Sequence, residues 1–323
     1  MTYFFSLNFK KRNITMPLSI GEGGSLEWQR LARVHEHPRD LRIQFNEEEH
    51  SYAIDGSKIG WVSCTQFKGQ FFGHFDPDAV IKKMMSGANW IKSPYYGRTA
   101  EDIKAGWAAS GDEASTAGTR MHLDIEHFYN SSELSEESMK RDDDWTPNPS
   151  VEWDQFMSYQ AKIGSKMEPY RTEWLVWNED LKLAGSIDML YKKDNGKYAI
   201  YDWKRSKEIK TENRYQSGYG PLSHLPDANY WTYSMQLNIY RMILKQKYDM
   251  EVDELALVIL HPNQANWRVI KINIMEEEVL GMFACRARAL TVPGNDGSNP
   301  VVVLDSHEEH DDSATPSGWV GLD

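Results

Sequence analysis

The sequence predicts an α/β fold in which helices flank a mixed central β-sheet, preceded by a mostly helical N-terminal extension. Three observations lead to this prediction. Three short strand patterns joined by tight turns occupy residues 171–207, a helical pattern follows over 229–248, and two further strand patterns precede a closing helix over 276–290. At 323 residues the chain is long enough to bury a large core around such a sheet.

Turn chemistry determines how the three strands in residues 171–207 pair. A four-residue turn at 179–182 joins the first strand to the second, and the tripeptide Asp-Asn-Gly at 194–196 is typical of a hairpin turn. Antiparallel pairing about these two turns places Glu173 opposite Asp188 and Asp188 opposite Asp202.

This pairing brings three acidic residues together on one face. Lys204 projects from the same face as Asp202, because side chains alternate along a strand. Each facing pair of carboxylates costs about 4 kcal/mol at a separation of about 4 Å and an effective dielectric constant of about 20. One lysine cannot balance three acids, so the sequence predicts a divalent cation with oxygen ligands at this face.

The alternative is that the same residues are solvated on the open face of an antiparallel sheet, where polar side chains are normal. Apolar and aromatic residues flank them on all three strands: Trp174, Val176, Ile187, Leu190, Ile200, Tyr201 and Trp203. This flanking pattern indicates that both faces are covered, which favours the cation site.

The remaining elements follow from periodicity and turn residues. We expect a hairpin over 42–65 with its turn at Asp55-Gly56, loops over 131–150 and 205–229, strands at 254–261 and 267–274, and helices over 77–86, 99–109 and 115–130. His122 lies on the last of these helices, where a histidine either packs or binds a ligand. The predicted domains are an N-terminal extension (1–40), a hairpin and helical region (41–114), a core (115–292) and a C-terminal extension with an acidic tail (293–323).

The net charge of −12 is unevenly distributed. The tail from Asp305 contains acidic residues and no Lys or Arg, whereas residues 192–214 carry an excess of basic ones. A basic rim beside an acidic metal site suits a phosphodiester substrate, although a solvated basic loop gives the same pattern. No apolar run approaches the roughly 20 residues that span a bilayer, so an integral membrane protein is excluded.

The N-terminal residues and the cysteines indicate the cellular compartment of the protein. Residues 1–21 contain Lys10, Lys11 and Arg12 but no acid, which fits a targeting leader or an unstructured start, and Met16 is a possible second initiator. The two cysteines, Cys64 and Cys285, form neither a disulfide framework nor a metal-cluster pattern. We therefore expect a reducing, intracellular compartment.

Five motifs in this order resemble the RecB-type branch of the PD-(D/E)XK nucleases. They are a G-x-x-x-H helix (Gly118 to His122), a glutamate on the next strand (Glu173), G-x-x-D (Gly185 to Asp188), D-x-K (Asp202 to Lys204) and Q-x-x-x-Y (Gln236 to Tyr240). The resemblance covers roughly residues 115–275. It implies a restriction-endonuclease-like core and metal-dependent hydrolysis of phosphodiester bonds.

The resemblance also implies roles for single residues. One or two Mg²⁺ or Mn²⁺ ions are implied to bind His122, Glu173, Asp188, Asp202 and the backbone carbonyl of Trp203. The implied catalytic residues are Lys204, Asp188, Asp202 and Glu173, with Lys204 orienting or deprotonating the attacking water. DNA contacts are expected from Gln236, Tyr240, Arg205, Lys207 and Arg214.

Two departures from relatives narrow the expected function. With only Cys64 and Cys285, the chain cannot hold a four-cysteine iron–sulfur cluster, and it has no P-loop for a nucleotide-driven motor. A nuclease without a cluster and without a motor resembles the stand-alone mitochondrial, viral and phage nucleases. We expect a DNA exonuclease that acts on free ends or single-stranded flaps in DNA repair, recombination or replication.

Two other functions stay open. One is a structure-specific endonuclease for DNA or RNA. The other is an inactive nuclease fold that only binds DNA, which the intact Asp188, Asp202 and Lys204 disfavour. Four aromatic residues in the N-terminal half either stack on unpaired bases or belong to the core: Trp90, Tyr95, Tyr96 and Trp107.

Overall fold

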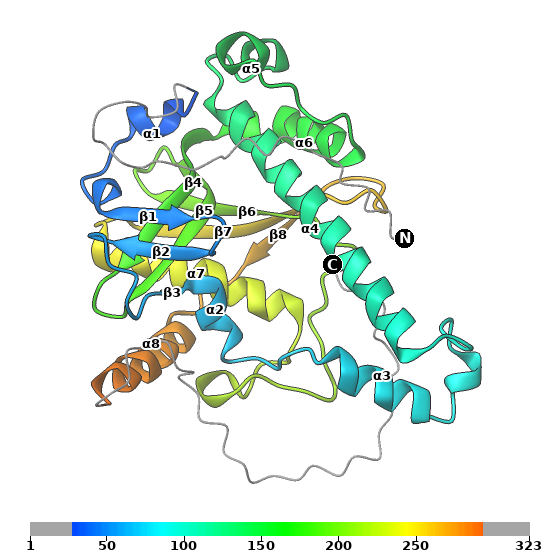
Figure 1. Cartoon of the computed structure of the whole chain (residues 1–323). Helices are drawn as coiled ribbons and strands as arrows, with labels where there is room; N and C mark the ends of the chain where they lie inside the picture. The colour runs from blue at the N-terminus through cyan, green and yellow to red at the C-terminus, as the bar shows by residue number, and fades with distance from the viewer. Residues whose placement is uncertain (1–27, 293–323) are drawn as a thin grey trace, which may run out of the picture.

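The computed structural model describes residues 28–292, in which a central sheet lies between two layers of helices (Figure 1). The possible leader, Met16 and the acidic tail lie outside these residues. None of the described helices has the length and apolar character needed to cross a membrane. The expected α/β class, a mixed sheet flanked by helices, is confirmed.

The α-helices in chain order are α1 (Arg30–Val34), α2 (Cys64–Gly69), α3 (Pro77–Ser86), α4 (Ala100–Asn130), α5 (Glu136–Asp143), α6 (Val151–Lys162), α7 (Asn229–Lys247) and α8 (Glu276–Thr291). The strands are β1 (Ile43–Asn46), β2 (Ser51–Ile54), β3 (Val62–Ser63), β4 (Glu168–Asn178), β5 (Leu183–Lys192), β6 (Tyr198–Lys204), β7 (Val252–Ile259) and β8 (Arg268–Ile272). Short 3₁₀ turns lie at Asp40–Arg42, Trp90–Lys92, Gly164–Lys166 and Gly220–Leu222.

The main sheet is mixed. Its order is β3-β5-β6-β7-β8, and β4 pairs with the other edge of β5. The β4–β5–β6 pairs are antiparallel, whereas β3 runs parallel to β5 and β7 runs parallel to β6. A parallel pair needs a long crossover, which α7 supplies between β6 and β7.

One edge of β5 is shared by two strands, and this creates a fork in the sheet. β3 pairs with β5 only at Leu183 and Ala184, and β6 pairs with it only from Met189 onward. Among the described strands, residues 185–188 of β5 have no ladder partner on this edge. Side chains rather than backbone groups therefore fill the space between β3 and β6.

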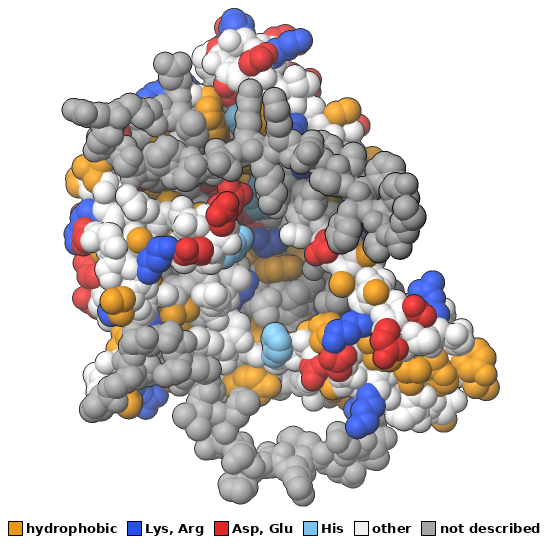
Figure 2. Space-filling view, viewed as in Figure 1, with side chains coloured by type: hydrophobic (Ala, Val, Ile, Leu, Met, Phe, Trp, Pro, Cys, Tyr) orange, Lys and Arg blue, Asp and Glu red, His pale blue; other side chains and the backbone are white. Residues whose placement is uncertain are grey.

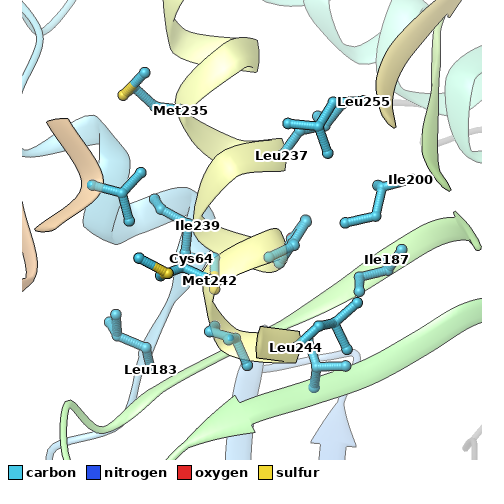
Figure 3. Packing of buried hydrophobic residues seen from close by; sticks show 14 of the residues in the cluster. Cys64, Leu183, Ile187, Ile200, Met235, Leu237, Ile239, Met242, Leu244 and Leu255 are labelled. Carbon is cyan, nitrogen blue, oxygen red and sulfur yellow. The ribbon is translucent and has the colours of Figure 1, made fainter. Parts of the chain in front are cut away.

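Each face of the sheet packs against its own helices. On one face α7 lies at the centre, and Figure 3 shows its Leu237 and Leu244 facing Ile187, Ile200 and Leu255 of the sheet. On the other face, aromatic residues of α4 and α6 pack around Trp203, which is 1% exposed. The two helical layers hold the fork from both sides.

The predicted strand register is confirmed. Trp174 pairs with Ile187 across a turn at 179–182, as the four-residue loop requires, and Met189 pairs with Tyr201 across the Asp-Asn-Gly turn. Glu173 and Asp188 are the residues between the observed pairs, so they face each other as expected. The β5–β6 ladder ends at Met189, however, one residue before Asp188 and Asp202 would pair.

Several predicted elements differ from the structure. The N-terminal hairpin turns at 47–50, because the tight turn at Asp55-Gly56 closes only an isolated bridge between Ile54 and Ser57. The helices predicted over 99–109 and 115–130 are one helix, α4, since Gly111 is accommodated in it without a break. The predicted loop over 131–150 contains α5, which Ser135 caps, and the sequence reading assigned no element where α6 lies.

Gly185 is the residue that allows α7 to approach β5 at the fork. A Cβ at this position would lie 2.7 Å from Cε1 and 2.9 Å from the hydroxyl oxygen of Tyr240, and 3.1 Å from Sγ of Cys64. We expect Gly185→Ala to lower the free energy of unfolding by about 1–3 kcal/mol, the usual cost of overpacking a core, in urea denaturation.

A matched control is Gly106→Ala on the exposed half of α4, where no atom lies within 4 Å of the added Cβ. This change should raise the free energy of unfolding by about 0.5–1 kcal/mol, because alanine favours helix interiors over glycine. Equal stability of Gly185→Ala and the wild type would contradict the packing described for Tyr240.

Candidate active site

The histidine of the site comes from the long helix α4. Thr99 caps its first turn, and Met121 and Ile125 are buried against the sheet, so His122 lies at the boundary between helix and strands. His122 Nε2 lies 3.0 Å from the backbone carbonyl oxygen of Trp203, to which it donates a hydrogen bond. Its Nδ1 lies 3.3 Å from Glu173 Oε1.

Glu173 reaches the site through an unusual backbone conformation. Its φ is 42°, in the left-handed region, although it lies within strand β4. This costs about 1–2 kcal/mol for a residue other than glycine. Ser186 of β5 donates a hydrogen bond of 2.9 Å to Glu173 Oε2, which leaves Oε1 facing His122.

Asp188 lies at the fork and is the last residue of β5 before its ladder with β6 begins. Its Oδ2 accepts a hydrogen bond of 3.0 Å from the backbone N–H of Trp203 and lies 3.6 Å from His122 Nδ1. A carboxylate therefore replaces the backbone pairing that ends at Met189. His122 and Asp188 together bind both polar groups of the Trp203 main chain, which fixes the position of its carbonyl.

Asp202 and Lys204 form a neighbouring pair at the end of β6. Lys204 Nζ lies 2.6 Å from Asp202 Oδ2, yet this oxygen accepts no well-directed hydrogen bond. Tyr233 of α7 lies beside them, with its ring centre 5.3 Å from Lys204 Nζ. Exposure ranges from 2% for the Asp202 side chain to 27% for that of His122, so the site opens on the His122 side.

Burial and neighbouring charges shift the pKa values of Asp188, Asp202, His122 and Lys204. Burial raises the pKa of both Asp188 and Asp202. Burial lowers the pKa of His122, but Asp188 and Glu173 outweigh it and raise the value to about 9. Burial lowers the pKa of Lys204, but Asp202 and Asp188 outweigh it and raise the pKa above its usual value. Lys204 is therefore a stable ammonium group here.

The structure places Gln236 and Tyr240 behind the site on α7. Tyr240 is 3% exposed and packs against Gly185, and Gln236 Nε2 donates a hydrogen bond of 3.3 Å to its hydroxyl. Gln236 Oε1 accepts a hydrogen bond from Lys68 of α2. The two residues thus hold each other and Lys68, while the ammonium group of Lys204 is bound by Asp202.

The residues of the basic stretch differ in their burial and in the acidic groups near them. Arg205 forms a 2.6 Å ion pair with Glu152 of α6, and Lys193 and Lys197 pair with acidic residues at the start of β7. Lys207 and Arg214 are exposed. Figure 2 shows acidic, basic and histidine side chains gathered at a hollow near the middle of the face that it views.

The four aromatic residues of the N-terminal half lie around α3 and the start of α4. Trp107 Nε1 donates a hydrogen bond of 2.9 Å to the hydroxyl of Tyr95, and Trp90 packs edge-on against Tyr96. Tyr96 is 59% exposed. These residues make two small aromatic contacts around α3 and the start of α4, outside the main core.

Sequence reasoning did not single out two buried charged residues near the site. Glu126, one turn after His122, accepts a hydrogen bond from Gln29, and burial and Glu173 raise its pKa far above the usual range. Lys68 occupies an apolar position of α2, in the i, i+3, i+4, i+7 series Cys64, Phe67, Lys68 and Phe71. A lysine within this apolar series is the one feature of the sequence that could have identified Lys68 as a buried charge.

The residues present fit a divalent cation with oxygen and imidazole ligands. Ligand-type atoms of His122, Glu173 and Asp188 lie within 4.8 Å of one another. Asp202 Oδ2 is buried without a directed donor, and the Trp203 carbonyl oxygen is held beside them. Carboxylate and carbonyl oxygens are the ligands that Mg²⁺ and Mn²⁺ prefer.

Comparison with known families agrees with this geometry. The sequence model of the PD-(D/E)XK nuclease superfamily matches residues 94–299, which include all the predicted site residues. Such nucleases generally use divalent metals. No curated protein matches the chain. The match and the mixed sheet flanked by helices confirm the expected restriction-endonuclease-like fold.

Proposed function

The chain belongs to the PD-(D/E)XK nuclease superfamily, which implies a metal-dependent nuclease, and from this premise we propose a DNA exonuclease that acts on free ends or single-stranded flaps. The observation that carries the proposal is the meeting of His122, Glu173 and Asp188 beside the Asp202–Lys204 pair at the fork. Acids, a histidine and a lysine at one partly open site are the groups that phosphodiester hydrolysis requires.

In this proposal His122, Glu173, Asp188, Asp202 and the Trp203 carbonyl hold one or two Mg²⁺ or Mn²⁺ ions. The metal supplies charge that polarises the phosphate and activates water. Lys204 orients the attacking water and stabilises the charge that develops on the phosphate, because its ammonium group is held at the site by Asp202. Ser186 keeps Glu173 turned toward the site through its hydrogen bond.

The exonuclease assignment is supported by the order of the motifs, which resembles the RecB-type branch. The chain also has only two cysteines, Cys64 and Cys285, both free thiols, so a four-cysteine cluster has no ligands. A role in DNA repair, recombination or replication, in a reducing compartment of a cell or in viral replication, belongs to the same proposal.

Digestion of end-labelled DNA tests the proposal. The full chain with Mg²⁺ or Mn²⁺ should release mononucleotides and short oligomers from 5′- or 3′-labelled single-stranded, duplex or flap DNA. EDTA should stop the reaction, and excess Mg²⁺ should restore it, because the site binds the cation only through oxygen and imidazole ligands.

Three other outcomes would each indicate a different function. Cutting of covalently closed circular DNA indicates an endonuclease, and cutting of circular RNA indicates an RNA endonuclease. If DNA is bound but never cut under any metal condition, the chain is a nuclease fold that serves as a binding module.

A further inference from the structure

Lys68 is a buried cation at the fork that neither the sequence motifs nor the family match includes. It lies on α2, which follows β3 directly and begins with a capping box between Ser63 and Gln66. The family match begins at residue 94, after this helix. β3 pairs with β5 next to Gly185, so the start of α2 is held at the open edge of β5.

The surroundings of Lys68 leave its charge incompletely compensated. Lys68 is 8% exposed and donates one hydrogen bond, to Gln236 Oε1, although an ammonium group has three donors. Among residues 28–292 no carboxylate forms an ion pair with it. Burying a charge without a counter-ion is costly, so a purely structural position would be better served by an apolar residue.

The nearby ammonium group of Lys204 further raises the free-energy cost of burying a charge at Lys68. The ring of Tyr233 lies 5.4 Å from Lys68 Nζ and 5.3 Å from Lys204 Nζ, so both ammonium groups surround one aromatic side chain. Lys204 is bound by Asp202, whereas Lys68 is not. Burial and then the charge of Lys204 lower the pKa of Lys68 to about 7, although Asp202 and Asp188 act in the opposite direction without forming an ion pair with it.

We propose that Lys68 binds a non-bridging phosphate oxygen of the substrate strand, next to the phosphate that is cleaved. A phosphodiester chain that places one phosphate over the carboxylates and Lys204 brings an adjacent phosphate within reach of the other ammonium group at Tyr233. The phosphate supplies the anion that Lys68 lacks. Gln236 is then a positioning residue, since it holds the Lys68 ammonium and is itself held by Tyr240.

This inference rests on the proposed nuclease function, and Lys68→Met tests it in the full chain. Methionine keeps a long apolar side chain and removes the charge. With single-stranded DNA and Mn²⁺ we expect KM to rise about tenfold or more, the effect of losing one charged hydrogen bond, with kcat changed by less than about twofold. Binding measured with Ca²⁺ in place of Mn²⁺ should weaken equally, and the slope of log affinity against log salt should fall by about one.

Two further variants separate a phosphate contact from a structural role. Lys68→Arg keeps the charge and should retain the salt slope of the wild type. Lys271→Met removes an exposed lysine of β8, 77% exposed, and should leave both KM and the slope unchanged. Thermal unfolding of Lys68→Met should show little change in stability, because the removal of a buried charge offsets the loss of the donor to Gln236 Oε1.

The outcomes distinguish the two proposals. If the wild type cuts DNA and Lys68→Met shows the same KM and salt slope, or loses only thermal stability, the phosphate contact is refuted while the nuclease function stands. If the wild type binds DNA without cutting it, the Ca²⁺ binding experiment still decides the contact. If it neither binds nor cuts DNA, both proposals fail.

Discussion

Asp202→Asn is expected to lower the rate of DNA cleavage by about a thousandfold or more, equivalent to about 4 kcal/mol of transition-state stabilisation. Asparagine keeps the size of the side chain but removes the negative charge that pairs with Lys204 and that we propose helps to hold the cation. Asp202 is buried and its Oδ2 has no directed donor, so no other group replaces this charge.

The measurement is single-turnover cleavage of labelled DNA, together with the rise in unfolding temperature that Mn²⁺ causes. The variant should show a smaller rise than the wild type, because the cation has lost a ligand. Asp180→Asn is the matched control, since Asp180 lies in the β4–β5 turn and is 74% exposed. Residual cutting by Asp202→Asn at the wild-type rate would remove Asp202 from the site.

Lys204→Met is expected to lower kcat by about a hundredfold to a thousandfold while the cation still binds. The ammonium group lies 2.6 Å from Asp202 and is the cation nearest to that carboxylate. Removing it takes away the charge that stabilises the transition state, but none of the proposed metal ligands.

Thermal unfolding gives this second variant a distinctive signature. Without Lys204 the buried Asp188 and Asp202 repel each other, so the metal-free protein should unfold at a lower temperature than the wild type. Mn²⁺ should then raise the unfolding temperature more than it does in the wild type, because it replaces the lost positive charge. An equal rise in the two proteins contradicts the electrostatic role given to Lys204.

The acidic part of the site was predictable because turn lengths alone determine strand register. A four-residue loop before Leu183 and an Asp-Asn-Gly turn after Lys193 leave one pairing that keeps the apolar residues inside. This placed Glu173 opposite Asp188 without knowledge of the tertiary structure. The positive φ of Glu173 was not predictable, because strand periodicity assumes an extended backbone at every position.

The contribution of the helices was harder to predict, since it depends on contacts between distant segments. Lys68 joins the site only because β3 pairs with β5, and a two-residue strand gives almost no periodic signal. Gly185 appeared as part of a motif, but its contact with Tyr240 depends on how closely α7 packs on the sheet. The helices expected over 99–109 and 115–130 are one helix, because α4 continues through Gly111.

The fork also bears on how the protein folds. β3 joins β5 by pairing position 62 with position 183, and His122 and Lys68 reach the acids from α4 and α2, segments far from them in the chain. Contacts over such sequence distances form slowly, because the intervening chain must first be ordered. The hairpins of residues 171–207 can pair early, but they then carry facing acids without His122 or Lys68. The charges that define the site therefore oppose its assembly until α4 and α2 dock, and docking completes the fold and the site in the same step.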